Sequence, residues 1–89
     1  MILLNKIEYE AFKELLVDAD ENDAEFFCDV LNDGARIFGM TDYDLSQQFG
    51  ASSIVISRWR SGVGAPIPPK RRPIFMFFTK LCNDFILLK

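Results

Sequence analysis

The sequence predicts an all-α protein, a compact bundle of about five helices that forms one domain. Apolar residues recur at helical spacing in several segments. Between these segments lie the serine, threonine, aspartate and glycine residues that begin and end helices. At 89 residues, 49% of them hydrophobic, the chain can build a single core and is too apolar for a disordered segment.

The first helix is expected from about Asn5 to Ala19. Its apolar stripe should face the core and consists of Ile7, Ala11, Leu15 and Ala19, widened by Phe12 and Leu16. A polar break, "DADEND", follows. We treat residues 1–22 as an acidic helical extension that precedes the rest of the domain.

The second helix should begin after Asp23, which can cap it, and end at Gly39 in a left-handed conformation. Its inward residues are expected to be Phe27, Val30, Leu31 and Phe38. Gly34 lies inside this helix, where glycine costs about 1 kcal/mol relative to alanine. We therefore expect another helix to cross closely at Gly34.

Two short helices are predicted next. Thr41 and Asp44 form a T-x-x-D capping box that begins the first of them. Gly50 permits a sharp turn, and Ser52 can cap the second short helix. A short helix, a glycine turn and another short helix is the layout of a helix-turn-helix.

The helix over residues 52–61 has two different faces. Val55, Ile56 and Trp59 should face the core. The opposite face consists of Ser53, Ile54, Ser57, Arg58 and Ser61. Most side chains of this face are small and none is a carboxylate, so the helix backbone could come close to the floor of a DNA major groove, which is about 12 Å wide.

A proline-rich link, residues 63–73, is expected to lead to a last helix that starts near Ile74. The link brings three cations, Lys70, Arg71 and Arg72, to the start of that helix, where the helix dipole opposes positive charge. An external polyanion would compensate them. Because the last helix is apolar around much of its circumference, a subunit interface is favoured over simple core filling.

Charge is divided unevenly along the chain. Residues 1–44 carry a net charge of −9, and residues 45–89 carry +6. Such asymmetry indicates binding to nucleic acid or to a charged protein. The acidic loop, which we define as Asp18, Asp20, Glu21, Asp23 and Glu25, is expected at the end of the bundle opposite the DNA.

Several other functions are disfavoured. The chain has no histidine for acid–base work, and no serine or cysteine has an evident activating partner, so we do not expect an enzyme. Cys28 and Cys82 are expected to be buried, reduced thiols, and neither a metal nor a cofactor is expected. "DADENDAEFFCD" matches the first ligand positions of a calcium loop but lacks its glycine and its glutamate, which favours a solvated loop.

The segment "TDYDLSQQFGASSIVISRWRSG" resembles the helix-turn-helix of phage-repressor (Cro/C1, Xre-type) regulators. The matching residues are Thr41, Leu45, Gly50, Ser52, Ile56, Ser57, Trp59 and Gly62. The resemblance covers roughly residues 23–82. It implies a small helical bundle that binds duplex DNA, commonly as a two-fold dimer on a palindromic operator.

The resemblance also implies roles for individual residues. Bases would be read by Ser53, Ile54, Ser57 and Arg58, and phosphates would be contacted by Ser52, Arg60, Lys70, Arg71 and Arg72. Three residues depart from the family pattern. Asp42 replaces a glutamine that contacts phosphate and would be repelled by it, Arg60 replaces a glutamate, and Ser46 replaces an alanine.

The expected function is therefore sequence-specific regulation of transcription, as a repressor, by a homodimer joined through the last helix. The alternative is a protein-interaction module, such as an antitoxin or antirepressor, whose acidic N-terminal half binds a basic partner. No apolar run approaches the roughly 20 residues that span a bilayer, and "MILL" is too short for a signal peptide, so a cytoplasmic location is expected.

Overall fold

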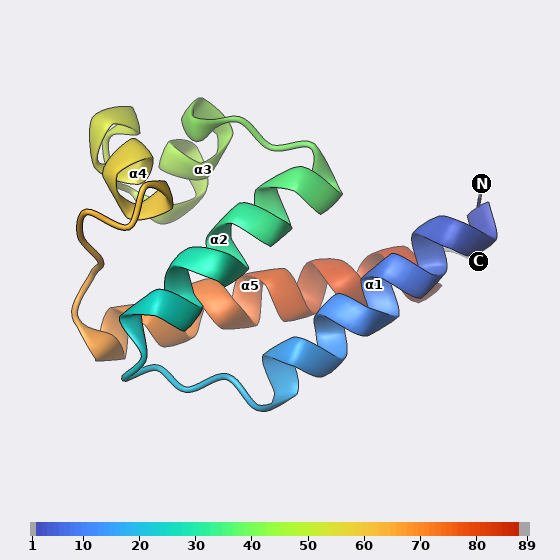
Figure 1. Cartoon of the computed structure of the whole chain (residues 1–89). Coiled ribbons are helices and arrows are strands. Elements are labelled where there is room, and N and C mark those ends of the chain that lie inside the picture. The colour runs from blue at the N-terminus through green and yellow to red at the C-terminus, as the bar shows by residue number, and fades with distance from the viewer. Residues whose placement is uncertain (1, 88–89) are drawn as a thin grey trace.

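The computed structural model describes residues 2–87, with side chains from residue 6 to residue 86, and this part of the chain contains five helices and no strand (Figure 1). The helices are α1 (Ile2–Val17), α2 (Ala24–Phe38), α3 (Asp42–Phe49), α4 (Ser53–Arg60) and α5 (Pro68–Leu87). The predicted all-α class with about five helices is confirmed. Among the described helices, none is both long and apolar enough to cross a membrane.

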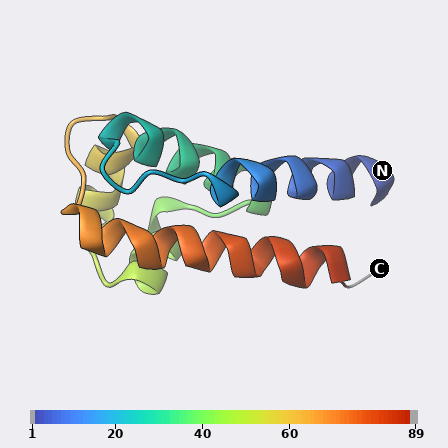
Figure 2. The same ribbon diagram turned by 90° about the horizontal axis from the view of Figure 1, so that it is seen from below.

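Three helices, α1, α2 and α5, form what we call the frame. α1 and α5 lie side by side and run in opposite directions, and α2 packs against both (Figure 2). Their inward side chains and two from the short helices make one core. The buried apolar residues are Phe12, Leu16, Phe27, Val30, Leu31, Ala35, Leu45, Ile56, Ile74, Phe75, Phe78 and Cys82.

The close helix crossing expected at Gly34 is present. Gly34 is buried in α2, and a methyl group built on it would overlap the ring of Phe78 from α5. Phe78 is itself fully buried and meets Phe12 of α1 at a ring distance of 5.8 Å. The glycine therefore lets α2 approach α5 closely enough for this ring to pack against its backbone.

The residues predicted to begin and end the helices do so. Asp23 caps α2 by accepting the amide proton of Phe26, and Thr41 and Asp44 complete their capping box at α3. Ser52 caps α4 by accepting the amide proton of Val55. Gly39 and Gly50 adopt left-handed conformations, with φ of 64° and 69°.

Three helix boundaries and one helix face differ from the prediction. α1 begins at Ile2 and ends at Val17, instead of running from about Asn5 to Ala19, and α5 begins at Pro68, six residues before the expected start. Prolines are tolerated in the first turn of a helix, because the amide protons of that turn have no intrahelical acceptor. In α1 the buried stripe is Phe12 and Leu16, whereas Ile7 and Leu15 are 54% and 40% exposed. The larger aromatic side chain decides which face turns inward.

The apolar circumference of α5 is largely used within the chain. α1 and α2 cover Phe75, Phe78 and Cys82, and exposure is concentrated at Met76 (64%) and Phe85 (38%). The surface that α5 offers to a second subunit is therefore smaller than its sequence indicates. Cys82 is buried and Cys28 only half-buried, and both are free thiols.

Candidate nucleic-acid interface

α4 is fixed to the core by its inner face. Ile56 is fully buried, and the ring of Trp59 meets Phe27 of α2 edge-on at 5.8 Å. Val55, which was also predicted to face the core, is half-buried. These contacts determine the rotation of α4 about its own axis, and the helix lies together with α3 at one edge of the molecule (Figure 1).

The opposite side of α4 is open to solvent. We call this side the outer face, and it consists of Ser53, Ile54, Ser57, Arg58 and Ser61, all of them exposed. Ile54 is 71% exposed. Among residues 6–86, whose side chains the structure describes, no carboxylate forms a salt bridge with Arg58. The structure thus brings together on one surface all four residues predicted to read bases.

Arg60 lies elsewhere, and its side chain is engaged by contacts inside the chain that compete with the predicted phosphate contact. Its Nη1 donates to Asp42 Oδ1 at 2.8 Å, and its Nε donates to Asn32 Oδ1 at 2.8 Å. The Asn32 side chain in turn donates to the carbonyl oxygen of Arg60 at 2.9 Å. We call these three residues the polar junction, because they tie the end of α4 to α2 and to the first turn of α3.

The polar junction also explains two departures from the repressor pattern. Asp42 was expected to repel phosphate, but its carboxylate is neutralised by Arg60. The two unusual residues therefore compensate each other. Sequence reasoning considered them one at a time and missed Asn32. Their opposite charges at the two ends of the predicted motif were the signal that could have paired them.

The basic cluster, which we define as Lys70, Arg71 and Arg72, does not form one cationic surface. Arg71 is only 8% exposed, and its guanidinium donates to the carbonyl oxygens of Pro66 and Glu21, both at 2.7 Å. Arg72 pairs with the Glu21 carboxylate at 2.9 Å. In this fold the Arg71 guanidinium joins two loops, so it offers little surface for the predicted phosphate contact.

The acidic loop lies on the side of the frame away from α3 and α4 (Figure 1). It is not remote from every cation, however, since Glu21 contacts both Arg71 and Arg72. Two further members have local roles: Asp20 accepts the amide proton of Asn22 at 2.9 Å, and Asp23 caps α2. Within the chain, the Glu21 carboxylate thus compensates the charge of Arg72 at the start of α5.

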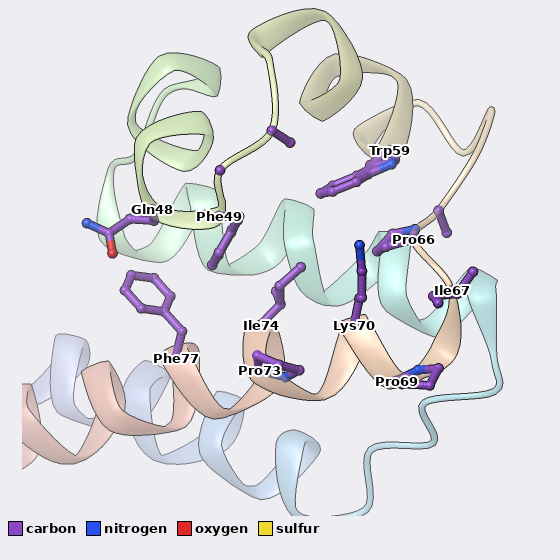
Figure 3. Close-up of a pocket in the computed structure, with 13 residues that line it drawn as sticks. Gln48, Phe49, Trp59, Pro66, Ile67, Pro69, Lys70, Pro73, Ile74 and Phe77 are labelled. Carbon is purple, nitrogen blue, oxygen red and sulfur yellow. The ribbon is translucent and has the colours of Figure 1, made fainter.

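A groove opens behind α4, between the α3–α4 turn, residues 65–67 and the first turns of α5 (Figure 3). Its volume is about 800 Å³. Its walls are mostly apolar, and Phe49 and Phe77 meet there edge-to-face at 5.2 Å. Lys70 rises from α5 into this space. The structure therefore directs Lys70 toward the groove rather than toward the outer face of α4.

Comparison with known proteins gives no relative. No protein-family model matches the chain, and neither the curated proteins nor the solved structures contain a significant match.

Proposed function

We propose that the protein is a sequence-specific, duplex-DNA-binding repressor in which α3, the Gly50 turn and α4 act as a helix-turn-helix. The observation that carries the proposal is the outer face of α4. This face is exposed, consists largely of small serine side chains, has no carboxylate and carries Arg58. A solvated helix of an ordinary acidic protein would normally show glutamate or lysine there. This function requires the protein to work in the cytoplasm, where its operator would be found.

The chemistry of the outer face supports base reading. The serines let the α4 backbone come close to base edges, and Arg58 has the bidentate geometry that suits guanine, worth about 1–3 kcal/mol of discrimination. Ile54 offers an apolar group to a thymine methyl. Ser52, at the start of α4, is exposed and can contact a phosphate.

Few cations are available for phosphate contacts in this arrangement. Arg60 and Arg72 are paired with carboxylates, and Arg71 is buried, which leaves Arg58 on the outer face and Lys70 beside the groove as the exposed cations of this region. Each neutralised phosphate contributes about −0.9 to the slope of log K against log salt. At most two phosphates would be neutralised, so we expect a slope of about −1 to −2 per subunit, shallow for a repressor.

A homodimer on a palindromic operator is part of the proposal. The second copy would pack against α5, where Met76 is exposed. Two recognition helices spaced about 34–36 Å apart would match one turn of duplex. Sedimentation in the presence of operator DNA should give two chains per duplex.

Selection of bound duplexes from a random pool tests the function. The wild-type protein should enrich a palindromic motif, and Arg58→Ala should lose a G·C preference in each half-site while its helix content is unchanged. Arg36→Ala is the matched control, because Arg36 is an exposed arginine of α2 that pairs with Glu8. An unchanged motif with Arg58→Ala would remove Arg58 as a base reader.

A protein-interaction module is the second candidate, and one observation favours it. The cations of the C-terminal half are largely neutralised inside the chain, whereas most of the acidic loop stays exposed. Such a surface suits a basic protein partner, as in an antitoxin or antirepressor. Failure to enrich any DNA motif, together with no retention on heparin at low salt, would favour this candidate over the repressor.

A further inference from the structure

The groove behind α4 has the walls of a binding site for a planar, apolar molecule. Phe49 and Phe77 form an aromatic pair on one side, and Trp59 projects over the other side from α4 (Figure 3). Ile74 lies between them, and Ile67 adds to the apolar lining beyond Pro66. A volume of about 800 Å³ lies within the roughly 300–1,000 Å³ of small-molecule sites.

The charge of the groove is equally specific. Of the residues that line it, all within the described part of the chain, Lys70 alone carries a charge, and no carboxylate reaches the walls. Lys70 points into the space between Ile74, Pro66 and Trp59 (Figure 3). Because α5 begins with Pro68 and Pro69, which have no amide proton, the ammonium group of Lys70 is the strong donor available to an anion there.

We propose that this groove binds an aromatic monocarboxylate, with its ring between Phe77 and Trp59 and its carboxylate on Lys70. The apolar walls stabilise the ring by burial, and one cation without a neighbouring acid selects a single negative charge. A neutral molecule would leave the ammonium group without its partner. A cationic molecule would be repelled by it.

The position of the groove connects such a ligand with α4. Trp59 faces the groove, whereas the neighbouring Arg58 lies on the outer face, so a bound ligand would not cover the outer face. The same ligand would touch the α3–α4 turn at Gly50 and Ala51 and the start of α5. It would therefore change how the two short helices sit on the frame. Ligand binding itself is independent of the proposed DNA binding, and only its regulatory effect rests on that function.

The single tryptophan provides the measurement, because Trp59 lines the groove. We would titrate the full chain, without DNA, with 4-phenylbutyrate, 4-phenylbutanol and 4-phenylbutylamine, and follow tryptophan emission excited at about 295 nm, where these probes absorb little. The carboxylate should give a saturable change with a Kd of about 0.1–1 mM, as expected for a ligand of this size. The alcohol should bind about fivefold more weakly, since one partly exposed ion pair is worth about 1 kcal/mol.

Two variants separate the site from a general apolar surface. Lys70→Gln should bind the carboxylate no better than the alcohol, while Lys80→Gln, on the same helix but paired with Asp84 away from the groove, should behave as wild type. Ala65→Leu should weaken the carboxylate more than tenfold by filling the groove, with circular dichroism used to confirm folding. Binding of the carboxylate, alcohol and amine with equal affinity would overturn the proposal. So would an unchanged emission, or a dimer in light scattering that Ala65→Leu dissociates.

Discussion

The frame and the pair of short helices are stabilised by different kinds of interaction. In the frame, phenylalanine rings from distant parts of the chain meet in the interior, as Phe12 meets Phe78 at 5.8 Å and Phe27 meets Phe75 at 6.1 Å. In α3 and α4, each eight residues long, the buried apolar side chains are only Leu45 and Ile56. The partly buried rings of Phe49 and Trp59, the caps, the glycine turns and the polar junction supply the remaining order there.

This difference indicates which substitutions unfold the protein and which move α4. Helices of eight residues are unstable alone in water, so α3 and α4 depend on docking to the frame. A change inside the frame should therefore lower the free energy of unfolding of the whole chain. A change at the polar junction should cost little stability and should instead alter the position of α4.

Arg71→Ala should give the largest loss of stability. Its buried guanidinium holds the carbonyl oxygens of Pro66 and Glu21, and each hydrogen bond from a charged group is worth about 1.5–3 kcal/mol. Allowing for relaxation of the two loops, we expect a loss of about 3 kcal/mol in urea unfolding. Arg72→Ala is the control and should cost less than about 1 kcal/mol, because Arg72 is 71% exposed. Equal losses for the two variants would contradict the buried role of Arg71.

Gly34→Ala should be next, at about 1–3 kcal/mol, because the added methyl group would overlap the Phe78 ring. The helix propensity of alanine would normally give a gain of about 1 kcal/mol, so the sign of the effect is itself informative. Gly64→Ala is the matched control, since nothing lies within 4 Å of the methyl group it would add. We expect that control to be neutral or slightly stabilising. A stabilised Gly34→Ala variant would mean that α2 and α5 do not cross closely.

The difference between local caps and turns on one hand and distant side-chain contacts on the other explains which features could be predicted from the sequence. Asp23, Thr41, Asp44, Gly50 and Ser52 act within a few residues along the chain, so their local pattern was sufficient to place the ends of the short helices. The same local pattern predicted that the outer face of α4 would be exposed, because that face follows directly from the inward positions of Ile56 and Trp59.

Contacts between distant residues could not be predicted in this way. Arg71 reaches Glu21 across 50 residues, and Arg60 reaches Asn32 across 28, so counting cations along the chain overestimated how many of them have no partner inside the chain. The face of α1 was misplaced for a related reason. The packing of Phe12 against Phe78 decides its rotation, and Phe78 is near the other end of the sequence.

Cys82 provides a test of the frame that depends on pH. Burial raises the pKa of this thiol from 9.0 to about 11, and nearby Lys13 opposes the shift only in part. A raised pKa stabilises the folded state below pH 9, and this contribution is lost as pH rises toward 11. Between pH 8 and pH 10, the wild type should lose about 1.4 kcal/mol more than Cys82→Ala in urea unfolding. Parallel pH profiles for the two proteins would show that the thiol is not buried in the native state.

The smallest effect on stability, and the sharpest test of how α4 is held, is expected from the polar junction. The Asp42 and Arg60 side chains are 38% and 31% exposed, so a double-mutant cycle with Asp42→Ala and Arg60→Ala should give a coupling of about 0.5–1 kcal/mol. The more exposed Glu8–Arg36 pair is the control, and its coupling should be nearer zero.

DNA binding by Arg60→Ala then distinguishes a positioning role from a phosphate contact. Loss of a phosphate contact would weaken binding to all sequences alike and would reduce the salt slope by about one. A positioning residue acts differently, because a tilted α4 loses the alignment of Arg58 and Ile54 with base edges while the protein keeps its remaining cations. We therefore expect Arg60→Ala to lower affinity for the selected operator more than for random duplex. Asp42→Ala should share this effect although it removes a negative charge. If Asp42→Ala instead tightened binding to both kinds of DNA, simple repulsion of phosphate by Asp42 would be the better account, and the polar junction would not determine how α4 is presented.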